Sequence, residues 1–486
     1  MNAGPTIVWF RQDLRLRDNP ALMAAIDRGG PVVPLYVWSP EEEGDWPPGE
    51  ASRWWLHHSL ESLDSSLRGR GARLIVRRGD SLANLRQVIV SAGASAVFWN
   101  RRVEPAARAR DIRIANHLAA EGVEVRTFGA GLLFEPEDLA GRNGKPYQVF
   151  TSFWRNCLDA PLTVREWEPP SSVPTVPAPI ESLSVADLGL LPSLDWTAGL
   201  RACWQPGEPG AMARLSDFLG SALGDYPRLR DRPDMDGVSR LSPHLHFGEI
   251  GPHRVWRAVR RRMEETGSPV TTEAGWSYLR QLGWREFAHY LLHHFPHTPG
   301  APLRPEFSAF PWQDDDAALK AWKRGRTGYP LVDAGMRELW ATGWMHNRVR
   351  MVVASFLAKD LLIDWRCGAR HFWDTLVDAD LANNTLGWQW TAGCGADAAP
   401  YFRIFNPARQ GGRFDPSGDY VRRWVPELSR LPAEWIHRPW EAPDGVLREA
   451  GVVLGEVYPH RIVDHGFARE RALAALATVR REEGER

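Results

Sequence analysis

The chain has 486 residues, 43% of them hydrophobic, and carries a formal net charge of -1 at pH 7. This length predicts two or three domains with large buried cores. The balanced charge excludes a protein whose whole surface attracts nucleic acid, so any such binding must rest on a local basic patch. The 24 tryptophans indicate either extensive aromatic core packing or stacking on flat ligands.

The cysteines and the apolar runs bear on where the protein works. The four cysteines lie far apart and form no C-x-x-C pair, which argues against structural zinc or an iron–sulfur cluster and fits a reducing compartment. No signal-like N-terminus and no run of 18 uncharged apolar residues occurs. We therefore expect a soluble, cytoplasmic protein that holds no metal and contacts no membrane.

Residues 6–128 alternate between short apolar runs and helix-like segments. The runs are 6–10, 31–38, 72–78, 95–100 and 123–128, and several of the intervening segments end in glycine. This alternation predicts an α/β domain with a doubly wound, Rossmann-like parallel sheet over residues 1–130. No G-x-G-x-x-G follows the first run, so we do not expect the main cofactor in that loop.

The remaining chain divides into a linker and a helical domain. Residues 161–192 contain seven prolines, which predicts an extended linker within residues 131–205. From about residue 206 the apolar residues take helical spacing and strand-like runs are scarce. We therefore expect an all-helical domain over residues 206–486.

One stretch of the helical domain, residues 378–407, combines features that mere packing does not need. It carries two acids two apart (Asp378 and Asp380), an Asn-Asn pair, two tryptophans two apart and a Gly-Cys-Gly. Buried carboxylates and amides must each find a partner. We interpret this stretch as the wall of a pocket for a large, planar, polar ligand.

Three further motifs carry polar and aromatic side chains at helical spacing. They are GVSRLSPHLHFGEI at 237–250, LRQLGWREF at 279–287 and WMHNRVRM at 344–351. The first offers hydroxyls and a helix start suited to phosphate, and the other two offer amides, arginines and indoles. No nucleophile–base pair stands out, so the pattern favours redox or photochemical work by a bound cofactor.

Two other groups have simpler interpretations. His289, His293 and His297 are four apart but lack the acidic partner of a metalloprotease motif, so we expect histidines on a helix surface. The basic run from Arg254 to Arg262 predicts a solvated helix face, with a DNA-phosphate track as the alternative.

The ordered motifs identify a resemblance. VWFRQDLRLRDNPAL, SRLSPHL, WREF, TGYPLVDAGMREL, TGWMHNRVRM, DADLANNTLGWQW and DAAPYFRIFNP resemble the photolyase/cryptochrome family over essentially the whole chain. The resemblance is strongest to bacterial photolyases that repair cyclobutane pyrimidine dimers. It implies an α/β antenna domain, a linker, and a helical domain that holds FAD in a U shape.

The resemblance also implies roles for individual residues. Asn384 would face the flavin N5 and favour the reduced states, while Trp388, Trp365 and Trp312 would pass electrons to the excited flavin. The FAD-binding set would be Tyr226, Val238, Ser239, Arg240, Leu241, Ser242, Tyr278, Arg285, Asp378, Ala379, Asp380 and Asn384. The set for the flipped dimer and its DNA would be Gln281, Trp284, Asn347, Arg348, Met351 and Trp390.

The implied activity is light-driven DNA repair by a monomer. Excited, reduced FAD would give one electron to a dimer flipped out of the duplex, the cyclobutane ring would split, and the electron would return. Close contact, orientation and a dry pocket are what the protein would supply.

The chain departs from the family pattern in two places, at Gln281 and in the antenna site. Gln281 stands where dimer-repairing relatives carry glutamate and six-four photolyases carry glutamine. Asn347 and Met351 stand where six-four photolyases carry two histidines, so dimer repair stays the first interpretation. Ala106 and Ala107 stand where folate-binding relatives carry Asn and Glu. A second, antenna chromophore is expected, and our choice is methenyltetrahydrofolate near Trp54 and Trp55.

The alternatives are a cryptochrome-type blue-light photoreceptor and a six-four photolyase. Cryptochromes often carry long C-terminal extensions, whereas this chain ends soon after its helical segments. The two tryptophans expected to clasp a dimer are both present. These features favour the enzyme.

Overall fold

The computed structural model describes residues 4–139, 141, 144–162, 166–177, 179–398 and 403–484. The chain folds into two compact units. The first unit comprises Met1–Gly224, Ser239–Pro296 and Val377–Asp380, and the second comprises Asp225–Val238, His297–Leu376 and Leu381–Arg486. The chain therefore passes between the units five times. The sequence-based division at residues 130 and 205 stays a prediction.

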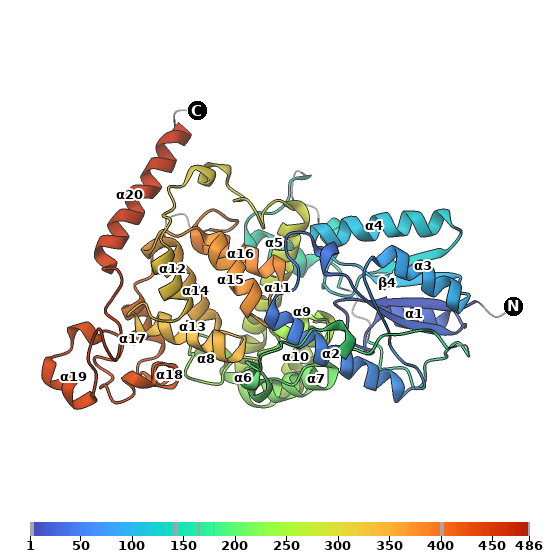
Figure 1. The fold of residues 1–486 in the computed structure, drawn as a ribbon, viewed down its shortest axis with the longest axis horizontal. Helices are drawn as coiled ribbons and strands as arrows, with labels where there is room; N and C mark the ends of the chain where they lie inside the picture. The colour runs from blue at the N-terminus through green and yellow to red at the C-terminus, as the bar shows by residue number, and fades with distance from the viewer. Residues whose placement is uncertain are drawn as a thin grey trace. The chain divides into compact units, whose positions relative to one another are not determined.

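The first unit is built on a five-stranded parallel sheet, which confirms the expected α/β fold. The strands are β1 (Thr6–Phe10), β2 (Val32–Trp38), β3 (Ile75–Arg78), β4 (Ala96–Asn100) and β5 (Glu124–Phe128), in the order β3-β2-β1-β4-β5. The crossover helices are α1 (Pro20–Asp27), α2 (Glu50–Arg68), α3 (Ser81–Ala92) and α4 (Pro105–Ala120) (Figure 1).

The central strands are buried because they are apolar on both faces, as parallel strands covered by helices require. Every residue of β1, β2 and β4 is buried. Trp9 and Trp99 pack edge to face with their ring centroids 5.6 Å apart. For these two residues the core-packing interpretation of the tryptophans holds.

The proline-rich segment runs beside the sheet. The amide nitrogen of Val173 donates to the carbonyl oxygen of Arg70, and the amide nitrogen of Leu183 donates to that of Val76. Between residues 161 and 192 the described part holds one short 3-10 turn, Ala186–Leu188. The extended course predicted from the prolines is confirmed there.

The helices of the first unit that follow the sheet are α5 (Phe150–Asp159), α6 (Ala198–Cys203), α7 (Glu208–Asp217), α9 (Ser242–His246), α10 (Pro252–Thr266) and α11 (Pro269–His294). α11 packs on α5 and α10. Glycine makes the approach to α5 possible, since a Cβ at Gly283 would lie 2.4 Å from the Trp154 ring.

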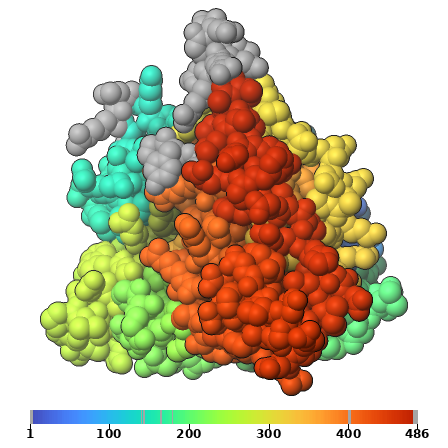
Figure 2. Space-filling view, turned by 90° about the vertical axis from the view of Figure 1, so that its left-hand side faces the viewer, coloured from blue at the N-terminus to red at the C-terminus, as the bar shows by residue number. Residues whose placement is uncertain are grey.

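The second unit is helical, as predicted. Its helices are α8 (Tyr226–Leu229), α12 (Asp316–Lys323), α13 (Pro330–Thr342), α14 (Asn347–Ser355), α15 (Trp365–Thr375), α16 (Leu381–Ala392), α17 (Pro407–Phe414), α18 (Asp419–Trp424), α19 (Asp444–Ala450) and α20 (His465–Gly484), with a π-helical turn η8 (Phe356–Asp360). Figure 2 shows the C-terminal elements, orange to red, gathered on one face. Within the described ranges, no helix has both the length and the apolar character that a membrane span needs.

Candidate functional site

The predicted flavin-binding residues of the first unit gather around α9 and α11. The hydroxyl of Ser242 donates to Oδ2 of Asp378 over 2.6 Å. The phenol of Tyr278 donates to the hydroxyl of Ser239 over 3.0 Å. Between the two serines, Arg240 adopts a left-handed backbone conformation with φ of 51°, which costs energy for a residue with a side chain. The turn that carries Val238 to Leu241 is thus tightly specified.

Asp380 is held by two histidines. Its Oδ2 lies 3.2 Å from Nε2 of His289 on α11 and 3.8 Å from Nδ1 of His246 on α9. All three residues are buried, at 7%, 5% and 8% exposure respectively. The expectation that His289 lies on a helix surface is therefore wrong, because its partner arrives from a segment about ninety residues later in the chain.

Burial and charge act in opposite directions on this pair. Burial by itself raises the pKa of Asp380, but the nearby His289, with a smaller effect from His246, holds that pKa well below its usual value. Burial lowers the pKa of His289, and the Asp380 carboxylate more than offsets this, so the pKa of His289 is raised. Both shifts describe one buried ion pair.

Arg285 is anchored to the backbone that follows β5. Its Nη1 donates to the carbonyl oxygen of Gly131 over 2.7 Å and lies 3.3 Å from Oε1 of Glu286. Glu286 accepts from the amide nitrogens of Leu133 and Phe134, and burial raises its pKa. This guanidinium is half-buried and fixed before any ligand arrives.

Trp284 has one face covered by protein. Its ring stacks on Phe150 of α5, with centroids 3.8 Å apart and planes 7° apart, and the indole is half-buried. Gln281, one turn earlier on α11, donates through Nε2 to the carbonyl oxygen of Ser277 over 3.2 Å. The indole is therefore held rigidly, which suits stacking on a planar ligand.

Most of the predicted residues of the second unit lie on α8, α14, α15 and α16, whereas Val238 and Trp312 lie outside the helices. Tyr226 on α8 is buried, and burial raises its pKa to about 12. Asn347 is exposed at the start of α14, and Met351 is half-buried one turn later. Arg348 pairs with Asp231 over 2.9 Å and lies over the Phe414 ring. Trp390 is half-buried near the end of α16.

The predicted electron-transfer tryptophans differ in accessibility. Trp388 and Trp365 are both 2% exposed, whereas Trp312 is half-buried and its ring centroid lies 4.3 Å from that of Phe310. Trp388 packs edge to face on Phe372 at 5.0 Å. Asn384 Nδ2 donates to the carbonyl oxygen of Ala369 over 3.0 Å, which ties α16 to α15.

The stretch 378–407 does not lie within a single unit. Asp378, Ala379 and Asp380 belong to the first unit, and the residues from Leu381 onward to the second. Residues 399–402 of this stretch lie outside the described part of the chain. The structure therefore assigns the predicted cofactor residues to both units.

The basic run on α10 is more closely paired than expected. Arg254 is 8% exposed and its Nε donates to Asp18 over 2.7 Å. Arg257 and Arg261 lie 3.0 Å and 3.5 Å from Glu166. The solvated-face interpretation is wrong for Arg254, and carboxylates neutralise much of the run, which weakens the phosphate-track alternative.

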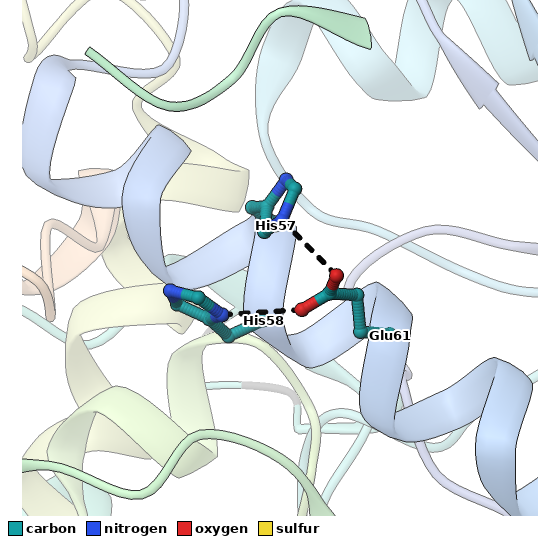
Figure 3. Close-up of side chains that lie close together, drawn as sticks. All are labelled: His57, His58 and Glu61. Atoms are coloured by element: carbon teal, nitrogen blue, oxygen red, sulfur yellow. Dashed lines mark hydrogen bonds and ion pairs between the residues drawn. The ribbon is translucent and has the colours of Figure 1, made fainter. Parts of the chain in front are cut away.

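One group in the described residues brings three metal-ligating side chains together. His57, His58 and Glu61 on α2 offer ligand atoms within 4.8 Å of one another, and both histidines face the same carboxylate at 3.3 Å (Figure 3). Nδ1 of His57 is buried without a partner, whereas a metal-bound histidine usually donates its other N–H to an acceptor. We interpret the group as two histidines that contact Glu61 and not as a metal site.

The proposed antenna position near Trp54 and Trp55 is enclosed. The two indoles are 2% and 0% exposed, and Nε1 of Trp55 donates to Glu249 over 2.9 Å. Because both indoles are buried, a folate bound in this region would contact side chains other than Trp54 and Trp55. The identity of a second chromophore stays a prediction.

Known families and proteins resemble the chain along its length. Residues 6–176 match the family described as DNA photolyase, and residues 278–478 match the FAD binding domain of DNA photolyase. The chain is 48% identical to a deoxyribodipyrimidine photo-lyase of Agrobacterium fabrum over 482 residues, which is 99% of each protein. It is 45% identical to cryptochrome-1 of Arabidopsis thaliana over 489 residues, covering 98% of this chain and 71% of that protein.

A solved structure gives the same picture. The crystal structure of a bacterial class III photolyase from Agrobacterium tumefaciens superposes with a TM-score of 0.95 at 48% identity, covering 99% of this chain and 98% of that one. The predicted resemblance, the two-part fold, and FAD as the cofactor of the helical region are confirmed. The prediction of an enzyme is confirmed, because relatives that match over their whole length are named deoxyribodipyrimidine photo-lyases.

Proposed function

The chain belongs to the photolyase/cryptochrome family, and we propose that it is a light-driven enzyme that repairs cyclobutane pyrimidine dimers in DNA. The observation that carries this proposal is Trp284, an indole stacked on Phe150 and half-open on the helix that also carries Gln281 and Arg285. Such a rigid ring lowers the entropic cost of binding a flat base.

The donor set of the first unit fits FAD. Asp378 and Asp380 supply hydrogen-bond acceptors, Arg285 supplies a cation, and Ser239 and Tyr278 supply hydroxyl groups. FAD offers ring and ribityl donors for the carboxylates, and carbonyl oxygens and phosphates for the guanidinium and the hydroxyl groups. When bound, FAD supplies light absorption and one-electron transfer. The residues Tyr226, Val238, Arg240, Leu241, Ser242, Ala379 and Asn384 complete the proposed FAD-binding set.

We assign the electron supply to Trp388, Trp365 and Trp312. Two enclosed indoles and one accessible indole suit a path from a buried cofactor to the protein surface, because only the last ring must meet an external donor. Asn384 lies one helical turn before Trp388 and is tied to α15. Its fixed amide would hold a hydrogen bond to the flavin in one orientation.

The dimer would be recognised by stacking and by amide hydrogen bonds. Trp284 and Trp390 would contact the flipped bases, Gln281 and Asn347 would bond base edges, Met351 would pack beside them, and Arg348 would support the pocket through Asp231. Flipping costs a few kcal/mol, less for a damaged base that already stacks poorly. The enzyme would act as a monomer on DNA in the bacterial cytosol.

The domain roles follow from this proposal. Residues 1–130 would form the antenna-chromophore domain, residues 131–205 the linker, and residues 206–486 the FAD- and DNA-binding domain. The antenna would be methenyltetrahydrofolate, and a spectrum of the purified protein would identify it.

A cryptochrome-type photoreceptor is the second candidate, favoured by the 45% identity to cryptochrome-1 and by the neutral amide at Gln281. An amide cannot share a proton with a developing radical anion, whereas a carboxylic acid can. Six-four repair is the third candidate.

The test separates these candidates by product. The chemically reduced protein is illuminated with matched oligonucleotides that carry a thymine dimer, a six-four lesion or no lesion, and the products are resolved by chromatography. Light-dependent restoration of the thymine-dimer strand alone supports the proposal. Restoration of the six-four strand alone selects the third candidate, and restoration of neither selects the photoreceptor. In the Gln281→Glu variant we expect more dimers repaired per absorbed photon.

A further inference from the structure

His289 makes two contacts that together fix its protonation state. Its Nδ1 lies 2.9 Å from the carbonyl oxygen of Arg285, one turn earlier on α11. A carbonyl oxygen only accepts hydrogen bonds, so Nδ1 must carry a hydrogen. Its Nε2 lies 3.2 Å from the carboxylate of Asp380, and an ionised carboxylate also only accepts. Both ring nitrogens are therefore donors, which defines an imidazolium cation.

The surroundings of the pair are buried and carry charges of both signs. Arg285 and Glu286 on the same helix, His246 on α9 and Glu104 at the start of α4 are ionisable groups that act on it. Arg285 opposes the charge on His289, and Glu104 opposes the charge on Asp380. His246, at 3.8 Å, is a longer and weaker contact. His289 is thus the main partner that keeps Asp380 ionised.

We propose that His289 is a positioning residue of the flavin site: its imidazolium holds the Asp380 carboxylate ionised and fixed, and FAD affinity falls when His289 loses that charge. The inference rests on the proposed role of Asp380 in binding FAD. An ionised, immobile carboxylate is a strong acceptor for the donors of FAD, whereas a buried carboxylate without its counter-ion is costly. His289 acts through Asp380 and requires no contact with FAD itself.

The sign of the pH dependence follows from the two shifts. The raised pKa of His289 means that its contribution is complete below the ordinary value of 6.5 and is lost as pH rises through the raised pKa. The lowered pKa of Asp380 means that the pair persists on the acid side until pH falls below 3.8. FAD affinity should therefore be level between pH 3.8 and pH 6.5 and should decline as pH rises through the raised pKa of His289.

The test measures FAD dissociation from the purified holoprotein against pH, by flavin fluorescence. In His289→Gln, FAD should bind about 10- to 100-fold more weakly below pH 6.5, the range for losing a hydrogen bond to a charged group. In His289→Arg, a permanent cation should restore the affinity and remove the alkaline decline. His117→Gln is the matched control, since exposed His117 makes the same Nδ1 contact to the carbonyl oxygen of Arg113, at 2.8 Å, on α4.

The outcomes separate this inference from the proposed function. If Asp380→Asn weakens FAD binding while His289→Gln binds FAD within about twofold of the wild type, the positioning role is wrong and the flavin site stands. If Asp380→Asn leaves affinity unchanged, the proposed role of Asp380 fails first. Nitrogen NMR of histidine-labelled wild-type protein gives a readout that needs no variant to fold: a single protonated ring nitrogen on His289 below pH 6.5 would overturn the inference.

Discussion

Trp388 and Trp284 both lie on packed helices, yet their rings differ in exposure to solvent. Trp388 is 2% exposed, and its ring lies so close to α15 that a Cβ at Gly368 would come within 2.1 Å of it. Trp284 is stacked on one face by Phe150 and stays half-buried. An enclosed ring can exchange electrons but cannot meet a base, and a half-open ring can stack on one. This difference distinguishes the two proposed roles.

The largest expected effect is the loss of flavin photoreduction when Trp388 is replaced, which tests electron supply apart from repair. In Trp388→Phe, light-driven reduction of the flavin by an external thiol should be largely lost, because phenylalanine is much harder to oxidise than tryptophan. Absorbance of the oxidised flavin during illumination measures it. Trp340→Phe is the control, since Trp340 is 68% exposed on α13. Unimpaired photoreduction in Trp388→Phe would remove Trp388 from the path.

The next effect concerns the half-open ring. In Trp284→Ala, the dissociation constant for a thymine-dimer oligonucleotide should rise about 10- to 100-fold, from the 1–3 kcal/mol typical of one stacked base. Fluorescence anisotropy measures it, with an undamaged oligonucleotide for reference. Trp276→Ala, on the same helix, should change it little. Equal losses for damaged and undamaged DNA would contradict stacking on the lesion.

A smaller effect tests whether Phe150 holds the Trp284 ring in place before the dimer binds. Phe150→Leu keeps apolar bulk under Trp284 but removes the aromatic stack, which contributes about 0.5–1.5 kcal/mol. Dimer affinity should fall about two- to tenfold, less than in Trp284→Ala. If Phe150→Leu matched Trp284→Ala in its loss, Phe150 would be a direct contact rather than a support.

The sequence allowed the sheet and the helical region to be predicted because their patterns are local. Apolar runs separated by helical periods define β1, β2 and β4 with little reference to distant residues, and β3 and β5 follow from the same alternation. The two-unit arrangement was not predictable in the same way, because Val377–Asp380 belongs to a unit whose other residues end at Pro296. Nothing local to those four residues marks that association.

The sequence predicts which residue types form the site, but it does not predict which residues pair with one another. His289 was placed on a surface because its carboxylate partner comes from a remote segment. A signal was present, since Tyr278, Gln281, Arg285 and His289 follow helical spacing along α11. The expectation that Arg254 lies on a solvated face is wrong for the same reason, because its partner Asp18 lies 236 residues away in sequence. Burial of a charge is decided by its partner, which spacing alone does not reveal.

The most direct test of dimer repair is the recovery of thymine absorbance in a thymine-dimer oligonucleotide. It is illuminated with the chemically reduced wild type, Trp388→Phe and Trp284→Ala. We predict full recovery with the wild type, recovery at a similar rate with Trp388→Phe, since chemical reduction bypasses the tryptophan path, and little with Trp284→Ala. No recovery with the reduced wild type, under light that its flavin absorbs, would contradict the assignment of dimer repair.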